Sequence, residues 1–283
     1  MTKKLPIGGQ AVIEGVMMKS DNHYCVSVLK EGKIKSQSKR IRRYRFDFLY
    51  LPFIRGFFQL LQILIIGIKT LIWSANQQAD EDEEFTFKEL FFVLFTSAFF
   101  TILFFIVLPL YLTKLFNFSS ALVFNLVDGL FRVTVFVIYL AIIAFMDDIK
   151  VLFEFHGAEH KAVNCYDSGL KLNTKNCKKF STKHPRCGTS FILIVLVISI
   201  IIFSFVLSES WWIKLLARIV LIPVIAGISY EILKLSAKFC NNWFFKAIIT
   251  PGMWLQKLTT REPSDDQIKV AIHSLKSVVK LER

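Results

Sequence analysis

Four long apolar segments limit what this chain can fold into. Leu90–Thr113 holds 24 residues without a charged side chain, and Cys187–Ser208 holds 22. About 20 helical residues suffice to cross the hydrocarbon core of a bilayer. Asn125–Phe145 and Trp211–Tyr230 are nearly as apolar. The sequence therefore predicts an all-α transmembrane bundle of about four spans, with Thr189–Leu207 as the lipid-embedded part of the second uncharged run.

Charged residues fall inside two of the predicted spans. Asp128 and Arg132 are four residues apart, so on a helix they share one face and offset each other's charge. Arg218 lies inside the last span, where we expect it to face other helices or to extend toward the membrane surface. Charges within a membrane commonly mark a functional site. They raise a transporter as a third hypothesis, although four spans without an internal repeat form a poor conduit.

Most of the positive charge lies outside the predicted spans. The formal net charge is +13 although 54% of the residues are hydrophobic. This combination excludes a disordered chain and a small disulfide-rich scaffold. Residues 1–47 hold 11 Lys and Arg against 4 acidic residues, and residues 149–186 hold 8 against 3. Because segments rich in Lys and Arg stay in the cytoplasm, both chain termini and the 149–186 loop are predicted to be cytoplasmic.

One apolar segment does not fit this topology as a span. Phe48–Trp73 carries a single polar stripe, formed by Arg55, Gln59, Gln62 and Lys69. A helix with one polar stripe either lies in the membrane surface or turns the stripe into a bundle. If this segment crossed the membrane, the basic N-terminus would lie outside. We therefore predict an interfacial or re-entrant helix over residues 48–76.

The remaining parts are predicted to form a small cytoplasmic α+β unit. Residues 7–45 alternate in polarity as strands do, with Glu31 and Gly32 as the turn of a β-hairpin. Ser264–Gln267 has the pattern of a capping box and predicts a helix in the C-terminal tail. In chain order the predicted organisation is a β-rich segment (1–47), an interfacial or re-entrant helix (48–76), two spans (90–146), a loop rich in His and Cys (147–188), two spans (189–230) and a tail with a helix (231–283).

The sharpest chemical signal is the string His156-Gly157-Ala158-Glu159-His160. On a helix its two imidazoles lie one turn apart on the same face, the spacing that two ligands of a tetrahedral Zn²⁺ require. His-x-x-Glu-His is also the order found in one class of zinc peptidases, in which the Glu acts on water at the metal. Glu159 is therefore the candidate catalytic residue. The alternative is a pair of surface histidines that binds nothing.

Two further candidate ligands lie in the same loop. His184 and Cys187 are three residues apart, and together with the histidine pair they make four N and S ligands. Four such ligands suffice for a closed, structural Zn²⁺ site, whereas three with a free position would make a catalytic one. Cys165 and Cys177 are alternative ligands, or buried thiols that stay reduced in the cytoplasm. The predicted cofactor is Zn²⁺.

Five strings of the sequence resemble one known family. They are GGQAVIEGVMM, FHGAEHKAVNCY, HPRCGTSF, PVIAGISYE and PGMWLQKLTTREP, and the resemblance runs from about Ile7 to Leu281. The family is the YqhQ-like family of bacterial multi-pass membrane proteins. The resemblance implies a location in the bacterial cytoplasmic (inner) membrane and a domain of unknown function, labelled at most a predicted metal-dependent enzyme. Its candidate metal strings coincide with His156, Glu159, His160, His184 and Cys187.

Two main hypotheses of function follow. The first is a metal-dependent hydrolase in which His156, His160 and His184 are ligands. Glu159 would be the general base, and Cys187 a fourth ligand or a group behind the ligands. The second is a non-enzymatic assembly or scaffold factor for membrane proteins, associated with the translocation machinery. In that case the metal would only stabilise the cytoplasmic loop.

The basic segments predict the partners. The Lys and Arg side chains of Lys35–Arg45 are expected to contact the anionic headgroups of the lipid bilayer. Other membrane proteins are the further expected partners. No specific nucleic acid is expected, because no aromatic platform of the kind that reads RNA accompanies the basic residues.

Overall fold

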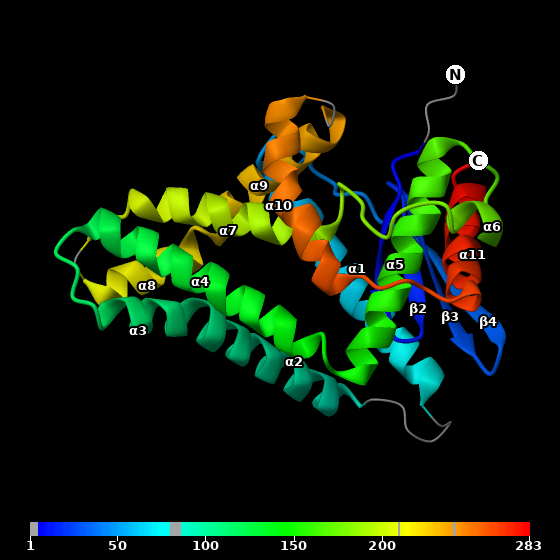
Figure 1. The fold of residues 1–283 in the computed structure, drawn as a ribbon, viewed down its shortest axis with the longest axis horizontal. Coiled ribbons are helices and arrows are strands. Elements are labelled where there is room, and N and C mark those ends of the chain that lie inside the picture. Colours follow the sequence, from blue (N-terminus) through cyan, green and yellow to red (C-terminus); the bar gives the residue numbers. More distant parts are fainter. Residues whose placement is uncertain (1–4, 80–85, 209, 240–241) are drawn as a thin grey trace.

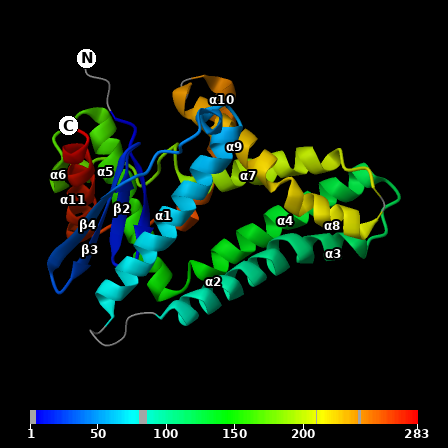
Figure 2. The same ribbon diagram turned by 180° about the vertical axis from the view of Figure 1, so that it is seen from behind.

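The two ends of the molecule differ in character. A small sheet with its covering helices forms one end, and a group of long apolar helices forms the other (Figure 1). Between them lie α1 (Ile54–Gln78), α9 (Ile222–Lys238) and α10 (Trp243–Thr259) (Figures 1 and 2). The structure is a computed structural model and describes residues 5–79, 86–208, 210–239 and 242–283.

The N-terminal segment forms a four-stranded antiparallel sheet, so the prediction of a single hairpin was incomplete. The strands pair in chain order and are β1 (Gly8–Val12), β2 (Gly15–Lys19), β3 (His23–Lys30) and β4 (Lys33–Arg40). The predicted turn at Glu31 and Gly32 is confirmed, since these residues have positive φ angles of 52° and 73°. Two-residue turns with positive φ match the twist of the strands that they join.

Helices cover both faces of the sheet. On one face, Met18 shares a core with α5 (Asp147–Ser168) and α11 (Asp265–Leu281). On the other face, the neighbouring residue Met17 shares a second core with α1. Successive side chains of a strand point to opposite faces. β2 therefore lies between two layers of helix, and the sheet has no solvent-facing side there.

The predicted C-terminal helix is confirmed as α11. Ser264 Oγ accepts a hydrogen bond from the Gln267 N–H (3.3 Å), and Gln267 Oε1 accepts one from the Ser264 N–H (2.8 Å). This reciprocal pair is the predicted capping box. At the other end of α11, the Glu282 carboxylate accepts hydrogen bonds from Ser20 and Asn22, which attaches the helix to the sheet.

α1 is one unbroken helix that lies along the sheet. The Gln10 side chain of β1 donates a hydrogen bond to the Gly67 carbonyl (3.2 Å), and the Gln78 side chain donates one to the Leu29 carbonyl (3.0 Å). In both views α1 lies between the sheet and the long apolar helices (Figures 1 and 2). The helix has no break, so these residues contain no re-entrant turn.

Two residues of the polar stripe of α1 form hydrogen bonds with neighbouring segments. Arg55 Nε and Nη2 donate to the Glu231 carboxylate of α9 at 2.7 and 2.6 Å. The Gln62 side chain donates to the Arg42 carbonyl at 3.1 Å. The stripe therefore holds α1 against α9 and the chain that leads out of the sheet.

Three helices among the described residues are long and apolar enough to cross a membrane, by length and composition alone. They are α1, the continuous helix Lys88–Lys114 and α4 (Ala121–Ile143). The second combines α2 (Phe87–Ile102), a π-helical turn and α3 (Leu108–Lys114). The last two of the three fall where spans were predicted.

The other two predicted spans differ from expectation. α7 (Gly188–Ser204) is apolar but has only 17 residues. The predicted span Trp211–Tyr230 is not one continuous helix, because α8 (Trp211–Val220) and α9 are bent by 48° at Leu221. Pro223 in the first turn of α9 explains the break, since proline lacks an N–H and clashes with the preceding turn. Counting the bent pair as one span brings the candidate total to four.

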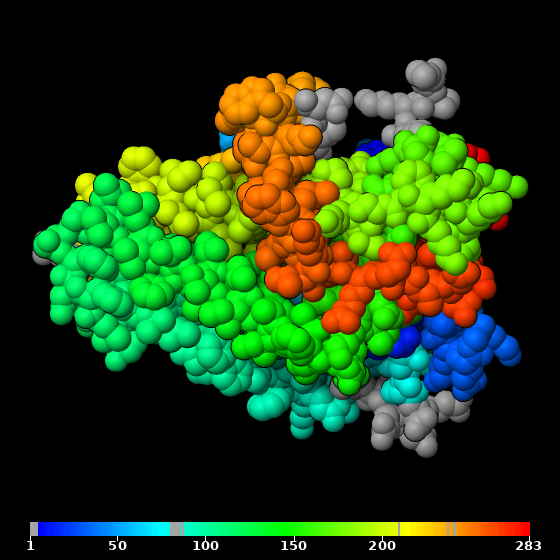
Figure 3. Space-filling view, in the orientation of Figure 1, coloured from blue at the N-terminus to red at the C-terminus, as the bar shows by residue number. Residues whose placement is uncertain are grey.

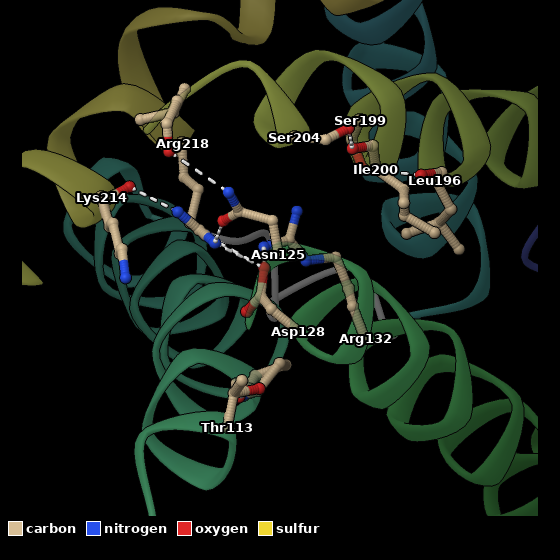
Figure 4. Close-up of polar contacts among 12 residues, drawn as sticks. Thr113, Asn125, Asp128, Arg132, Leu196, Ser199, Ile200, Ser204, Lys214 and Arg218 are labelled. Atoms are coloured by element: carbon tan, nitrogen blue, oxygen red, sulfur yellow. Dashed lines mark hydrogen bonds and ion pairs between the residues drawn. The ribbon is translucent and has the colours of Figure 1, made fainter. Parts of the chain in front are cut away.

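Asp128, Arg132 and Arg218 of the predicted spans form one buried cluster (Figure 4). The predicted pair is present, with Arg132 Nη2 donating to Asp128 Oδ2 at 3.1 Å. Arg218 of α8 donates to the same oxygen through Nε (3.2 Å) and Nη2 (2.7 Å), and to Asn125 Oδ1. Both guanidinium groups also lie against the Phe203 ring. Arg218 thus faces other helices, and the cluster joins α4, α7 and α8.

Candidate metal centre

α5 places the histidine pair as its spacing predicted. The helix begins with two acidic residues in its first turn, which suit the positive end of the helix dipole. It ends at Ser168 and is followed by Gly169, whose φ of 81° is unfavourable for any residue with a side chain. Within it the rings of His156 and His160 lie with centroids 4.4 Å apart.

Cys187 completes a group of three ligand atoms. It is the residue that precedes α7, where its Sγ accepts a hydrogen bond from the Thr189 N–H (3.4 Å). Its Sγ lies 3.3 Å from His156 Nε2. Three ligand atoms, one from each of His156, His160 and Cys187, lie within 4.8 Å of one another. Two imidazoles and a thiolate are donors that Zn²⁺ prefers.

Backbone carbonyls orient both imidazoles of this group. His156 Nδ1 lies 2.7 Å from the Thr259 carbonyl, and His160 Nδ1 lies 2.6 Å from the Thr182 carbonyl. A carbonyl can only accept, so each Nδ1 carries the proton and each Nε2 offers a lone pair. Histidines that bind metals are typically held in this way. His160 Nε2 is buried and has no hydrogen-bond partner among the described residues, as a ligand atom would.

His184, the other predicted ligand, is not part of this group. Its Nδ1 accepts a hydrogen bond from the Arg186 N–H (3.2 Å), and its Nε2 lies 3.5 Å from Asp167 Oδ2. Burial lowers the pKa of the imidazole, and the Asp167 carboxylate partly offsets that effect. The His184 ring lies 5.8 Å from that of His160. His184 therefore lies next to His160, and both of its ring nitrogens have other partners.

Glu159 is buried beside the group without joining it. Burial raises the pKa of its carboxyl to about 7, while His156 and a hydrogen bond from the Gly9 backbone oppose that rise. Its Oε2 has no partner among the described residues. Gly9 of β1 leaves room for it, because a Cβ there would lie 3.2 Å from Glu159 Cδ and 2.3 Å from the Met17 carbonyl oxygen.

The alternative ligands Cys165 and Cys177 lie elsewhere. Both are free thiols buried in the core between α5 and α11. Burial and the neighbouring Cys165 raise the pKa of the Cys177 thiol to about 12. The structure thus agrees with the interpretation of these residues as buried, reduced thiols.

Three residues of the site had no signal in the sequence. Thr182 and Thr259 act through their carbonyls, which every residue possesses. Gln256 of α10 is fully buried and accepts a hydrogen bond from the His184 N–H while donating to the His184 carbonyl, both at 2.9 Å. It also donates to Ser190 Oγ. Gln256 thereby fixes the chain on both sides of Cys187.

The comparisons with known proteins give a family without an activity. The family model described as "Protein of unknown function (DUF1385)" matches residues 51–281. The chain is 31% identical over 296 aligned positions to the "Uncharacterized protein YqhQ" of Bacillus subtilis (strain 168). The alignment covers 97% of this chain and 92% of that protein. No solved structure matches the chain.

Proposed function

This chain belongs to the DUF1385 family, whose function is unknown, and we propose that it is a membrane-embedded hydrolase with a zinc centre at His156, His160 and Cys187. The supporting observation is the convergence of three ligand atoms from α5 and the start of α7 within 4.8 Å. Two carbonyls hold the imidazoles in the tautomer that metal binding needs.

Three protein ligands leave one position of a tetrahedral site free, which is typical of catalytic zinc. Zn²⁺ bound there supplies Lewis acidity toward an oxygen of water or substrate. The Cys187 thiol loses its proton on binding the metal. We retain Glu159 as the proposed general base, because its Oε2 is buried beside His156 without a hydrogen-bond partner in the described part of the chain.

Membrane embedding is proposed from the surface of the apolar helices. Phe91, Phe95 and Leu130 are each more than 60% exposed, and they belong to a much longer series of exposed apolar side chains on α2, α4, α7 and α8. An exposed apolar surface of this extent fits lipid better than water. The N-terminus, the loop between α5 and α7 and the C-terminal tail would lie on the cytoplasmic side.

α1 is proposed to lie in the membrane surface. Its hydrogen bonds to the sheet extend from Gly67 to Gln78. If α1 crossed the bilayer, the attached sheet would have to enter the bilayer with it. An open sheet edge cannot enter the hydrocarbon region, because its backbone groups would lose their hydrogen bonds. Leu64 and Ile65 on α1 are more than half exposed and would contact lipid. The long apolar sequence of α1 is thus explained without a crossing.

A second candidate function follows from the burial of the ligands. His160 is 2% exposed and Cys187 6% exposed. A buried site could hold a structural zinc that joins α5 to α7 in a non-enzymatic assembly or scaffold factor. Metal removal separates the two functions, because a structural zinc contributes directly to folding. Unfolding of the cytoplasmic part on chelation would favour the scaffold, whereas an intact fold would favour the hydrolase.

The zinc content of the purified full-length chain tests the proposal. Wild type is expected to hold one Zn²⁺ per chain, and His160→Ala to lose it. The matched control is His273→Ala on α11, which removes an exposed histidine outside the site and should keep the metal. Glu159→Gln should also keep it. Equal zinc in wild type and His160→Ala would refute the site, and loss of zinc from Glu159→Gln would make Glu159 a structural residue.

A further inference from the structure

The zinc centre lies where apolar helices end. Cys187 directly precedes the apolar helix α7, and Thr259 is the last residue of α10. α5, which carries the two histidines, follows α4 after a turn of three residues. In the space-filling view α10 lies between the apolar helices and the part of the molecule that holds α5 and α6 (Thr174–Cys177) (Figure 3). If the apolar helices are in lipid, the centre lies at the cytoplasmic surface of the bilayer.

An exposed tryptophan supports this depth. Trp254, five residues before Thr259 on α10, is 65% exposed. Tryptophan is enriched at the level of the lipid headgroups, where its apolar ring and its N–H are both accommodated. The neighbouring Leu258 is also exposed. The last turns of α10 therefore present a surface suited to the headgroup region beside the zinc ligands.

Basic residues lie close along the chain to three residues that bind or orient the metal. Lys183 follows Thr182, Arg186 precedes Cys187, and Lys257 and Arg261 lie two positions before and after Thr259. Besides the buried Glu159, two nearby acidic groups are paired with bases. Asp167 accepts from Arg186, and Glu262 pairs with the buried Lys161 at 2.7 Å. A substrate that approaches from the bilayer surface would therefore meet an excess of basic residues on these segments.

We propose that the zinc centre takes an anionic phospholipid of the cytoplasmic leaflet, with the headgroup phosphate at the free position and Lys183 and Lys257 as its recognition groups. This inference rests on the function proposed above. Phosphate oxygens are good partners for Zn²⁺ and for Lys and Arg. The two remaining bases have other contacts, since Arg186 binds Asp167 and Arg261 donates to the Ala144 carbonyl. The acyl chains would stay in lipid beside α10.

Cobalt-substituted full-length protein in detergent tests this assignment. Co²⁺ bound to a thiolate has a visible spectrum that changes when a ligand enters the coordination sphere. The probes are short-chain phosphatidylglycerol, short-chain phosphatidylcholine and inorganic phosphate. We expect phosphatidylglycerol to change the spectrum at about tenfold or more lower concentration than either other probe, because its net charge and its chains both contribute to binding.

A pair of variants tests the recognition groups. Lys183→Gln with Lys257→Gln should weaken phosphatidylglycerol binding by about tenfold or more. The matched control, Lys276→Gln with Lys280→Gln, removes the same charge from an exposed face of α11 and should leave binding unchanged.

Each contrary outcome has a distinct meaning. Equal effects of phosphatidylglycerol and phosphatidylcholine would overturn the role of charge, and a response to inorganic phosphate as strong as that to the lipid would overturn the lipid source. A cobalt spectrum that no probe changes would overturn the inference while leaving the metal site in place. Failure of the wild-type chain to bind Co²⁺ at all would instead refute the proposed function itself.

Discussion

Replacing Asp128 by Asn tests the physical account of the apolar bundle. Asp128 is 1% exposed, and its Oδ2 accepts three hydrogen bonds, one from Arg132 and two from Arg218. Asn keeps the shape of the side chain but removes the negative charge. The guanidinium groups of Arg132 and Arg218 would then remain buried without the carboxylate that pairs with both of them.

The expected loss is large because one partner of a buried ion cluster is removed. Such changes typically cost about 3–5 kcal/mol, most of it from the charge left without compensation. For a chain of this size that corresponds to a decrease in Tm on the order of 10 °C. Replacing all three charged residues by apolar side chains of similar volume should recover much of the loss, since a well-packed apolar core often equals a buried ion pair in stability.

The assay is thermal unfolding of the full-length protein in detergent, with Asp21→Asn as the control. Asp21 is exposed at the turn before β3, so its replacement should change the stability by less than about 0.5 kcal/mol. If Asp128→Asn melted as close to wild type as Asp21→Asn does, the cluster would contribute little, and the account of how α4, α7 and α8 are joined would be refuted.

Three further predictions concern the cytoplasmic part. Gly9→Ala should destabilise the protein by about 1–3 kcal/mol, because the added Cβ would lie 2.3 Å from the Met17 carbonyl oxygen. The control Gly8→Ala should be tolerated, because nothing lies within 4 Å of its added Cβ. Equal melting temperatures of the two variants would contradict this prediction. Burial alone would raise the pKa of the Glu282 carboxyl, but the hydrogen bonds that it accepts from Ser20, Asn22 and His23 outweigh burial and hold the pKa at about 2. The resulting stabilisation is fully present above the ordinary carboxyl pKa of 4.5 and is lost as the pH falls toward 2, so the deficit of Glu282→Gln, on the order of 2 kcal/mol at pH 7, should shrink at pH 3; a deficit independent of pH would contradict the assignment. Gln256→Leu should cost about 1–3 kcal/mol because it leaves the His184 N–H buried without a partner, and a melting temperature equal to that of wild type would show that this link is dispensable.

The helices could be predicted from the sequence because their signals are local. An uncharged run of 24 residues identifies Leu90–Thr113, and the Ser264–Gln267 pattern identifies the start of α11. The break at Leu221 has a local signal as well, which is Pro223. Mean hydropathy over a window of residues does not reveal it, because one proline hardly changes the mean. In contrast, the number of strands was underestimated. Met17 and Met18 are both buried, so β2 lacks the alternation that marks a half-exposed strand.

The histidine pair of the candidate site was predictable because both ligands share one helix. His156 and His160 are placed by helical spacing, and Cys187 was among the residues expected to join them. His184 was expected too, but the contacts that engage its ring come from Asp167 and Arg186, and their position depends on how the loop folds. Whether the apolar helices enter a membrane stays a prediction from length and composition.

Zinc K-edge X-ray absorption on the full-length protein tests the central claim most directly. A centre built from His156, His160 and Cys187 predicts one sulfur ligand at about 2.3 Å and nitrogen or oxygen ligands at about 2.0–2.1 Å. Cys187→Ser should remove the sulfur shell. A chain that holds no stoichiometric zinc, or zinc with no sulfur ligand in the wild type, would contradict the account.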